Sequence, residues 1–229
     1  MELFDARCRQ PRDSLRCCWR IWPARASTAP RYLGEDGLGR EILTFVPSEV
    51  PAKWRAFADE QITAAGVLLR RMHDASRGLA ERLGGGAVVC HHDPGPNNTV
   101  FRDDLPVAFI DFDFAAVGDP LKDVGYMAWS WCISSKPARG LPTEQACQVR
   151  VLADAYGLSA DQRRRLVTAI EDRFVRNECF WRERIDACQP VQAGPTAAEV
   201  LAWTRQEAAH FASYRSVFAG ALNSVPDRS

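Results

Sequence analysis

Apolar residues recur every three or four positions through most of the chain after residue 59, which is the spacing of one buried helix face. Asp59 is expected to cap the first helix, and Gly157 to end the third. Two capping boxes, Ser159–Gln162 and Thr196–Glu199, predict the starts of the last two helices. The helices predicted on this pattern cover residues 59–79, 121–132, 143–156, a long segment that opens at Ser159, and one that opens at Thr196.

The last two helices are long enough for their buried faces to be predicted residue by residue. Positions at helical spacing that carry large apolar side chains are expected to face the core. They are Val167, Ile170, Phe174, Trp181, Ile185 and Cys188 in the first of the two, and Leu201, Phe211 and Phe218 in the second.

Short runs of β-branched and aromatic residues predict strands before and after the first helix. Residues 87–90 are apolar and predict a buried strand, and residues 99–101 and 106–110 predict a hairpin. Ahead of the first helix, residues 31–33 and 40–46 predict another hairpin around a glycine-containing turn. The chain is therefore predicted to be an α+β protein with a few short strands and a mainly helical second part.

Acidic and amide side chains follow the predicted strands where each one ends. Asp93, Asn98, Asp111 and Asp113 are expected to lie together on one side of a small sheet. Like charges about 4 Å apart repel by roughly 4 kcal/mol at an effective dielectric near 20. A hard divalent cation removes that repulsion, and Asp and Asn oxygens suit Mg²⁺. A carboxylate left off the metal is then free to accept a proton from a hydroxyl, so the pattern favours phosphoryl transfer.

Several neighbouring side chains have simpler explanations. Asp119 precedes Pro120 as a helix N-cap would. Asp103 and Asp104 are expected to be solvated turn residues, and His73 to pack on a helix face. Two interpretations of Asp113 stay open, a second partner of the metal or a surface acid.

Composition narrows the class of protein further. Twenty-nine basic and 29 acidic residues among 229 give a formal net charge of zero, so nothing favours nucleic acid or an anionic membrane as partner. The eight cysteines form neither a disulfide pattern nor a metal pattern, and the chain shows no signal peptide or membrane-spanning run. We therefore expect a cytoplasmic protein with reduced thiols.

Residues 1–29 mix six arginines with cysteine and tryptophan and hold no helical or strand period. We expect a poorly ordered, atypical segment. Our hypothesis is that it reflects a shortened or misread gene start.

Three motifs occur in order around the acidic positions: His91-x-Asp93-x₄-Asn98, Ile110-Asp111-Phe112-Asp113 and Gly118-Asp119-Pro120-x₂-Asp123. Together they resemble the aminoglycoside phosphotransferase family, which is related to protein kinases and choline kinases. The family usually has Gly or Asn at position 92 and an apolar residue at position 94, where this chain has His92 and Pro94. Asn97 adjoins Asn98, and the spacing favours Asn98 as the family's asparagine.

The resemblance implies a role for each matching residue. Asp93 would be the catalytic base, with His91 orienting its loop. Asn98 and Asp111 would be magnesium ligands. Asp123 would brace the catalytic loop by accepting its backbone N–H groups.

The resemblance also implies a kinase-like fold with a truncated N-terminal lobe. Residues 30–50 would be a remnant hairpin and hinge, in which Thr44, Phe45 and Val46 receive the adenine of ATP. Residues 51–222 would form the catalytic C-terminal lobe, and residues 223–229 a tail. The implied activity is Mg²⁺-dependent transfer of a phosphoryl group from ATP to a hydroxyl of a small molecule.

The acceptor is not fixed by these motifs. Family members phosphorylate aminoglycosides, choline-like alcohols and sugars, and acids such as Glu178, Glu183 and Asp186 would recognise a cationic acceptor unless they are solvated helix-face charges. No glycine-rich loop precedes residue 34, and no lysine precedes Lys53. An alternative is therefore a degenerate kinase fold that acts as a binding module without catalysis. A third hypothesis is a metal-dependent phosphoesterase that uses His91, His92, Asp93 and Asp111 around two metals.

Overall fold

A computed structural model describes residues 30, 32–38, 40–47, 50–51, 55–187 and 195–224. The atypical segment 1–29, Cys188 and the end of the predicted tail lie outside the described residues. The elements follow in the order β1 (Tyr32–Glu35), β2 (Glu41–Leu43), α2 (Asp59–Arg82), β3 (Val88–Cys90), the 3₁₀ turn Pro96–Asn98, β4 (Thr99–Arg102), β5 (Leu105–Phe109), β6 (Ala116–Gly118), α3 (Leu121–Met127), the π-helical segment Ala128–Cys132, the 3₁₀ turn Pro137–Arg139, α4 (Pro142–Tyr156), α5 (Ala160–Asp186), α6 (Ala197–Ser213) and α7 (Arg215–Asn223).

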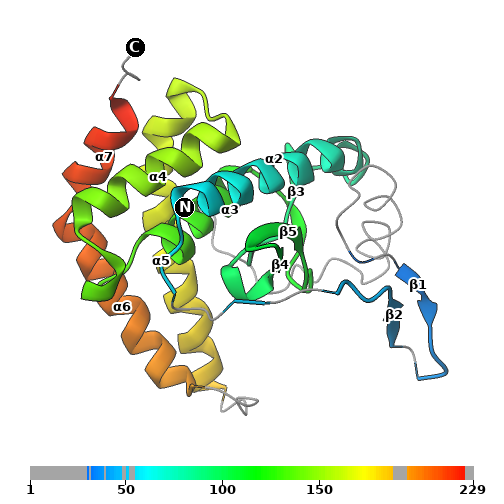
Figure 1. Cartoon of the computed structure of the whole chain (residues 1–229). Helices are drawn as coiled ribbons and strands as arrows, with labels where there is room; N and C mark the ends of the chain where they lie inside the picture. Colours follow the sequence, from blue (N-terminus) through cyan, green and yellow to red (C-terminus); the bar gives the residue numbers. More distant parts are fainter. Residues whose placement is uncertain are drawn as a thin grey trace.

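The β1–β2 hairpin projects away from the helices at the right of Figure 1. Its turn is held by Asp36, whose carboxylate accepts hydrogen bonds from the backbone N–H groups of Leu38 and Arg40 at 2.8 and 2.9 Å. The Arg40 guanidinium also donates to Asp36 at 2.6 Å. The predicted hairpin is therefore present, and a local side-chain interaction closes it.

The helices form the bulk of the described chain. Helix α2 packs on α4, and α4 packs on α7, while α5 lies against α3, α6 and α7 (Figure 1). The predicted inward residues Val167, Ile170 and Phe174 of α5 are buried. None of the helices in the described part of the chain combines the length and apolar character needed to span a bilayer.

The strands form separate two-stranded sheets, so the prediction of one small sheet was wrong. Strand β3 pairs antiparallel with β6, and β4 pairs antiparallel with β5. We did not predict β6, because its three residues are too short to show a period-two pattern. The β4–β5 turn was predicted, and Asp103 and Asp104 take positive φ angles of 51° and 61° there, as a two-residue hairpin turn requires.

The helix boundaries differ from the predictions at three places. Ala58, not Asp59, is the N-cap of α2, and its N–H donates to the Gln61 side chain at 3.0 Å. The buried face of α5 is shorter than predicted, because Ile185 is 39% exposed and Trp181 is only partly buried. The last predicted helix is broken at Tyr214 into α6 and α7.

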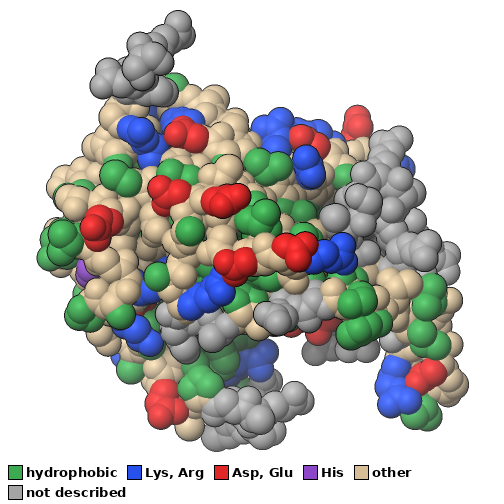
Figure 2. All heavy atoms as spheres, viewed as in Figure 1, with side chains coloured by type: hydrophobic (Ala, Val, Ile, Leu, Met, Phe, Trp, Pro, Cys, Tyr) green, Lys and Arg blue, Asp and Glu red, His purple; other side chains and the backbone are tan. Residues whose placement is uncertain are grey.

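The other helix ends follow the sequence. The capping boxes at Ser159 and Thr196 are formed, and Gly157 ends α4 in the left-handed conformation. Their partners lie three residues away, so these caps depend on local sequence alone. Acidic and basic side chains are interspersed over the face shown in Figure 2, in keeping with a net charge of zero.

Gly125 provides a test of how α3 is seated on α5. A Cβ at this position would lie 2.9 Å from the Ala169 carbonyl oxygen, which is backbone and has little room to move. We expect Gly125→Ala to lower the free energy of unfolding by about 1–3 kcal/mol, measured by urea denaturation. The matched control is Gly220→Ala in α7, where no heavy atom lies within 4 Å of the added Cβ. The control should be neutral or stabilising by up to about 1 kcal/mol, and equal effects of the two changes would contradict the close α3–α5 contact.

Candidate active site

A buried carboxylate lies beneath the loop that carries the His-x-Asp motif. Asp123 on α3 is fully buried and accepts hydrogen bonds from the backbone N–H groups of His91 and His92 at 2.6 and 2.8 Å. Its Oδ2 atom also lies 3.0 Å from His73 Nε2 on α2. Burial alone would raise the pKa of Asp123, but the hydrogen bond and charge of His73, with the charges of His92 and His91, lower it to about 2.

We call the hydrogen bonds that Asp123 makes with the loop and with His73 the brace, and it continues into α4. His73 Nδ1 lies 2.7 Å from the Tyr156 hydroxyl, and both rings are buried. In the His73 tautomer that donates from Nε2 to Asp123, Nδ1 accepts the Tyr156 O–H. His73 packs on a helix face, as predicted, but it also joins α2, α3 and α4 through one chain of hydrogen bonds.

The loop from His92 to Asn98 has its own internal hydrogen bonds. The Asn98 side-chain amide donates to both the backbone oxygen and the Oδ2 atom of Asp93, each at 2.9 Å. Trp131 Nε1 donates to the Pro94 oxygen at 3.0 Å, and the Thr99 hydroxyl donates to the Gly95 oxygen at 2.9 Å. The Asp93 carboxylate is therefore held against the Asn98 amide by the fold of the loop.

His91 connects this loop to the strand end that carries Asp111. Its Nε2 atom lies 3.0 Å from the Ile110 carbonyl oxygen and must donate, because a carbonyl only accepts. Its Nδ1 then accepts the Asp93 N–H at 3.3 Å. The ring packs on Phe112 with centroids 4.4 Å apart, and the Ile110 N–H donates to the Asn98 oxygen at 2.9 Å.

The acidic residues at this strand end interact with the loop. Asp111 is exposed and has a positive φ of 64°. Desolvation raises the pKa of Asp111, and the carboxylates of Asp113 and Asp93 raise it further. Asp111 therefore lies within the field of both Asp93 and Asp113, and Asp113 is exposed.

This donor set suits a hard cation. The carboxylate oxygens of Asp111 and the amide oxygen of Asn98 are the ligand types that Mg²⁺ prefers, and the Asp93 carboxylate lies beside them. The Asn98 Oδ1 atom is turned away from Asp93 and accepts from Asn97 Nδ2 at 2.9 Å. The alternative amide orientation would place two oxygen acceptors against each other, so the oxygen of Asn98 is available on the side away from Asp93.

A second cluster, His73, Cys90 and Asp123, has ligand atoms within 4.8 Å of one another. It does not suit a metal, because Asp123 already accepts three hydrogen bonds and the Cys90 thiol donates to the Asp119 oxygen at 3.3 Å. Burial, followed by the charge of Asp123, raises the pKa of that thiol and keeps it protonated. The cluster is structural.

The remaining predicted residues lie farther from this centre. Thr44, Phe45 and Val46 follow β2 at the base of the projecting hairpin, and Phe45 is 85% exposed. Glu178, a candidate for recognising a cationic acceptor, forms ion pairs with Arg182 and Arg205. Asp119 caps α3 through its hydrogen bond from the Leu121 N–H at 2.9 Å, as predicted.

Sequence reasoning missed two residues beside Asp93. The pKa of the buried Tyr126 hydroxyl is raised by burial, then by the charge of Asp93 and a side-chain hydrogen bond to it. The Arg173 guanidinium lies 4.0 Å above the Tyr126 ring and donates to the His92 oxygen at 3.1 Å. Neither residue belongs to the three motifs, and only the packing of α5 on α3 brings Arg173 and Tyr126 to the loop.

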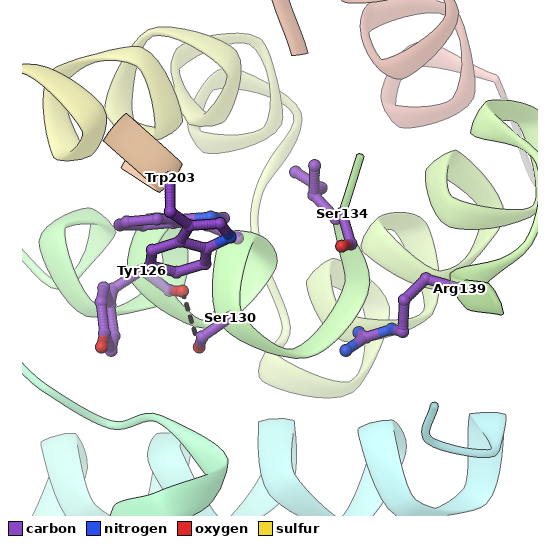
Figure 3. A pocket seen from close by; sticks show the side chains of 7 residues that line it. Tyr126, Ser130, Ser134, Arg139 and Trp203 are labelled. Carbon is purple, nitrogen blue, oxygen red and sulfur yellow. Dashed lines mark hydrogen bonds between the residues drawn. The ribbon is translucent and has the colours of Figure 1, made fainter. Parts of the chain in front are cut away.

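Tyr126 also lines a pocket. It is shown in Figure 3, where Arg139 extends its guanidinium from the edge toward the aromatic and serine side chains. The Ser130 hydroxyl donates to the backbone carbonyl oxygen of Tyr126 at 2.9 Å. The lining residues are Tyr126, Trp129, Ser130, Ile133, Ser134, Arg139 and Trp203.

The projecting hairpin, the mainly helical lobe and the acidic loop are those of a kinase-like phosphotransferase. The sequence pattern of the phosphotransferase enzyme family matches residues 77–166, which include all three motifs. The trifolitoxin immunity protein of Rhizobium leguminosarum bv. trifolii is 30% identical over 219 residues, covering 85% of this chain and 82% of that protein. The chain belongs to the phosphotransferase enzyme family.

Two solved structures share the fold. A choline/ethanolamine kinase family protein from Mesorhizobium loti has a TM-score of 0.59 at 16% identity, covering 93% of this chain and 85% of that one. A putative aminoglycoside phosphotransferase from Ralstonia eutropha has a TM-score of 0.57 at 15% identity, covering 86% and 82%. The predicted kinase-like α+β fold is confirmed.

Asp123→Asn tests the brace. The amide retains one oxygen and turns an NH₂ group toward a donor, so a buried N–H loses its acceptor. We expect a loss of about 3–5 kcal/mol in the free energy of unfolding at pH 7, measured by urea denaturation.

The pH dependence of this loss has a definite sign. The native pKa of Asp123, about 2, lies below the unfolded value of roughly 3.9. The stabilisation is therefore complete above about pH 4 and is lost as the pH falls toward 2. The gap between the wild type and Asp123→Asn should narrow over that range, and a gap that stays constant would contradict an ionised Asp123.

Proposed function

We propose that this phosphotransferase moves a phosphoryl group from ATP to a hydroxyl of a small molecule. The observation that supports it best is the connection through His91, which holds the Asp93–Asn98 loop against the strand end at Ile110–Asp111. This connection supports a site in which the Asp93 carboxylate would lie beside oxygens that hold a metal, and phosphoryl transfer depends mainly on this kind of positioning.

Each residue then has a role in the reaction. Asp93 accepts the proton of the acceptor hydroxyl or holds that hydroxyl in line, and Tyr126 and Asn98 keep its carboxylate oriented. Asn98 and Asp111 hold magnesium, which when bound neutralises charge on the phosphates. Asp113 supports Asp111 from the edge of the site.

The nucleotide would enter between the hairpin and the loop. In this proposal the backbone of Thr44, Phe45 and Val46 receives adenine, and His91 and Asp123 keep the loop in its reactive shape. We also propose that the protein works in the cytoplasm, where ATP is supplied.

Substitution of the two aspartates separates their roles. We expect Asp111→Ala to abolish phosphoryl transfer, because it removes the main metal ligand. Asp93→Ala should leave a weak remnant, reduced by about 10²–10⁴-fold, which is the usual contribution of general-base help. The measurement is transfer from γ-labelled ATP across a magnesium titration, with exposed Asp161→Ala on α5 as the control of unchanged rate. Equal residual rates in the Asp93 and Asp111 variants would refute the assignment.

The likeness to the trifolitoxin immunity protein supports a second, compatible proposal. The protein would protect a cell against a toxin, either by phosphorylating the toxin or a related target, or by binding it without catalysis.

Expression in a trifolitoxin-sensitive strain decides between these two routes. We expect wild-type protein to protect and Asp111→Ala to fail, because protection by catalysis needs the metal site. Equal protection by both would show that the protein acts as a binding module. Absence of protection by either, at matched protein levels, would sink the immunity proposal.

A further inference from the structure

The pocket beside Tyr126 has no role in the proposed reaction as described so far. Its volume is about 20 Å³, more than the roughly 10–15 Å³ that one water needs but too little for a whole acceptor molecule. Tyr126 lines this pocket and also contacts Asp93 through its hydroxyl. A group held in the pocket would therefore lie one aromatic side chain away from the proposed base.

One wall of the pocket is a buried cation. Arg139 is only 9% exposed, and its guanidinium donates to the Trp131 backbone oxygen. Among the described residues, no carboxylate lies within ion-pair distance of Arg139, and the face of Phe57 lies 6.0 Å away. Burial lowers the pKa of Arg139, and the charges of Cys132 and Glu207 oppose this shift only in part.

Another lining residue of the pocket, Trp129, has an N–H group without a hydrogen-bond partner. Trp129 is 2% exposed, and its Nε1 atom has no hydrogen-bond partner. An indole N–H only donates, so it requires an acceptor from outside the side chains already present. The stacked neighbour Trp203, by contrast, donates its Nε1 to Glu207 at 3.1 Å.

Acidic side chains near the pocket are already engaged. Glu207 accepts from the Ser135 N–H and hydroxyl at 2.9 and 2.6 Å as well as from Trp203. Glu178 is paired with two arginines. On the Asp93 side of Tyr126, Arg173 adds another positive charge. The surroundings of the pocket thus offer donors and positive charge, which oppose a cationic acceptor.

We propose that the acceptor carries a carboxylate group, which Arg139 and the Trp129 N–H bind in this pocket while the acceptor hydroxyl faces Asp93. The assignment of the hydroxyl rests on the proposed function, whereas carboxylate binding does not. The carboxylate supplies two acceptor oxygens, one for the guanidinium and one for the indole N–H. The proposal replaces the expectation that helix-face acids recognise a cationic acceptor.

Indole N–H resonances give a direct test of binding. The Trp129 resonance is assigned as the one missing from the ¹⁵N spectrum of Trp129→Phe. Benzoate should shift this resonance, whereas benzylamine, of matched size and opposite charge, should not. Arg139→Gln should weaken the benzoate response by about 10- to 100-fold, the range for a charge-assisted hydrogen bond. Exposed Arg164→Gln on α5 is the matched control and should respond as the wild type does.

Either of two results overturns the proposal: a Trp129 resonance that neither probe moves, which shows that the pocket holds only water, or one that benzylamine moves as strongly. Should Arg139→Gln fail to fold, as judged by circular dichroism, the decision rests on saturation-transfer measurement of benzoate affinity in Trp129→Phe. That change removes the N–H donor together with part of the indole ring, and it should weaken benzoate binding; unchanged affinity overturns the proposal.

An assay of phosphoryl transfer tests the carboxylate inference and the proposed function separately. Hydroxy acids from glycolate to 6-hydroxyhexanoate are compared with amino alcohols from ethanolamine to 6-aminohexanol. The best acid should exceed the best amine by at least about tenfold in kcat/KM, and Arg139→Gln should remove the preference. If transfer favours the amino alcohols, the inference that the acceptor carries a carboxylate is overturned and the proposed function is not. Absence of transfer to any of these compounds overturns the proposed function alone, because the benzoate response of the wild-type protein is expected to persist.

Discussion

The arrangement of the whole site depends on one buried anion. The Asp123 carboxylate accepts the backbone N–H groups of His91 and His92 and contacts His73, so it couples the loop to helices α2 and α3. Tyr156 on α4 extends the same chain of hydrogen bonds. A buried charge is tolerated only when its hydrogen-bonding capacity is met, so helix packing and loop shape require each other. The chain turns at His92, which has a positive φ of 66°. This turn directs two successive backbone N–H groups toward Asp123.

His91 joins the loop to the strand end that carries Asp111. Tyr126 contacts the loop at Asp93 and also lines the pocket. The proposed metal side and the proposed acceptor side of Asp93 are thus built by different elements: the strand end at Ile110 on one side, and helices α3 and α5 on the other. The loop is fixed by backbone hydrogen bonds, whereas the acceptor side is lined by helix side chains.

The sequence predicted what depends on local pattern. The capping boxes at Ser159 and Thr196 and the turn at Asp103–Asp104 were predicted because their partners lie within three residues. The pairing of β3 with β6 was missed, since it joins three-residue segments about 30 positions apart. The roles of Tyr126 and Arg173 were also hidden, because periodicity shows which face of a helix is apolar but not which loop that face meets. The proposed nucleotide-binding residues Thr44, Phe45 and Val46 stay a prediction.

The central claim is that oxygens of Asn98 and Asp111 converge on one cation while Asp93 stays free beside it. Anomalous diffraction from crystals grown with Mn²⁺ and a non-hydrolysable ATP analogue tests this most directly. The account predicts a manganese peak bonded to the Asp111 carboxylate and the Asn98 side-chain oxygen, with a phosphate oxygen completing the shell and no bond to Asp93. A peak that is absent from this site, or one bonded to Asp93 in place of Asn98, would contradict it.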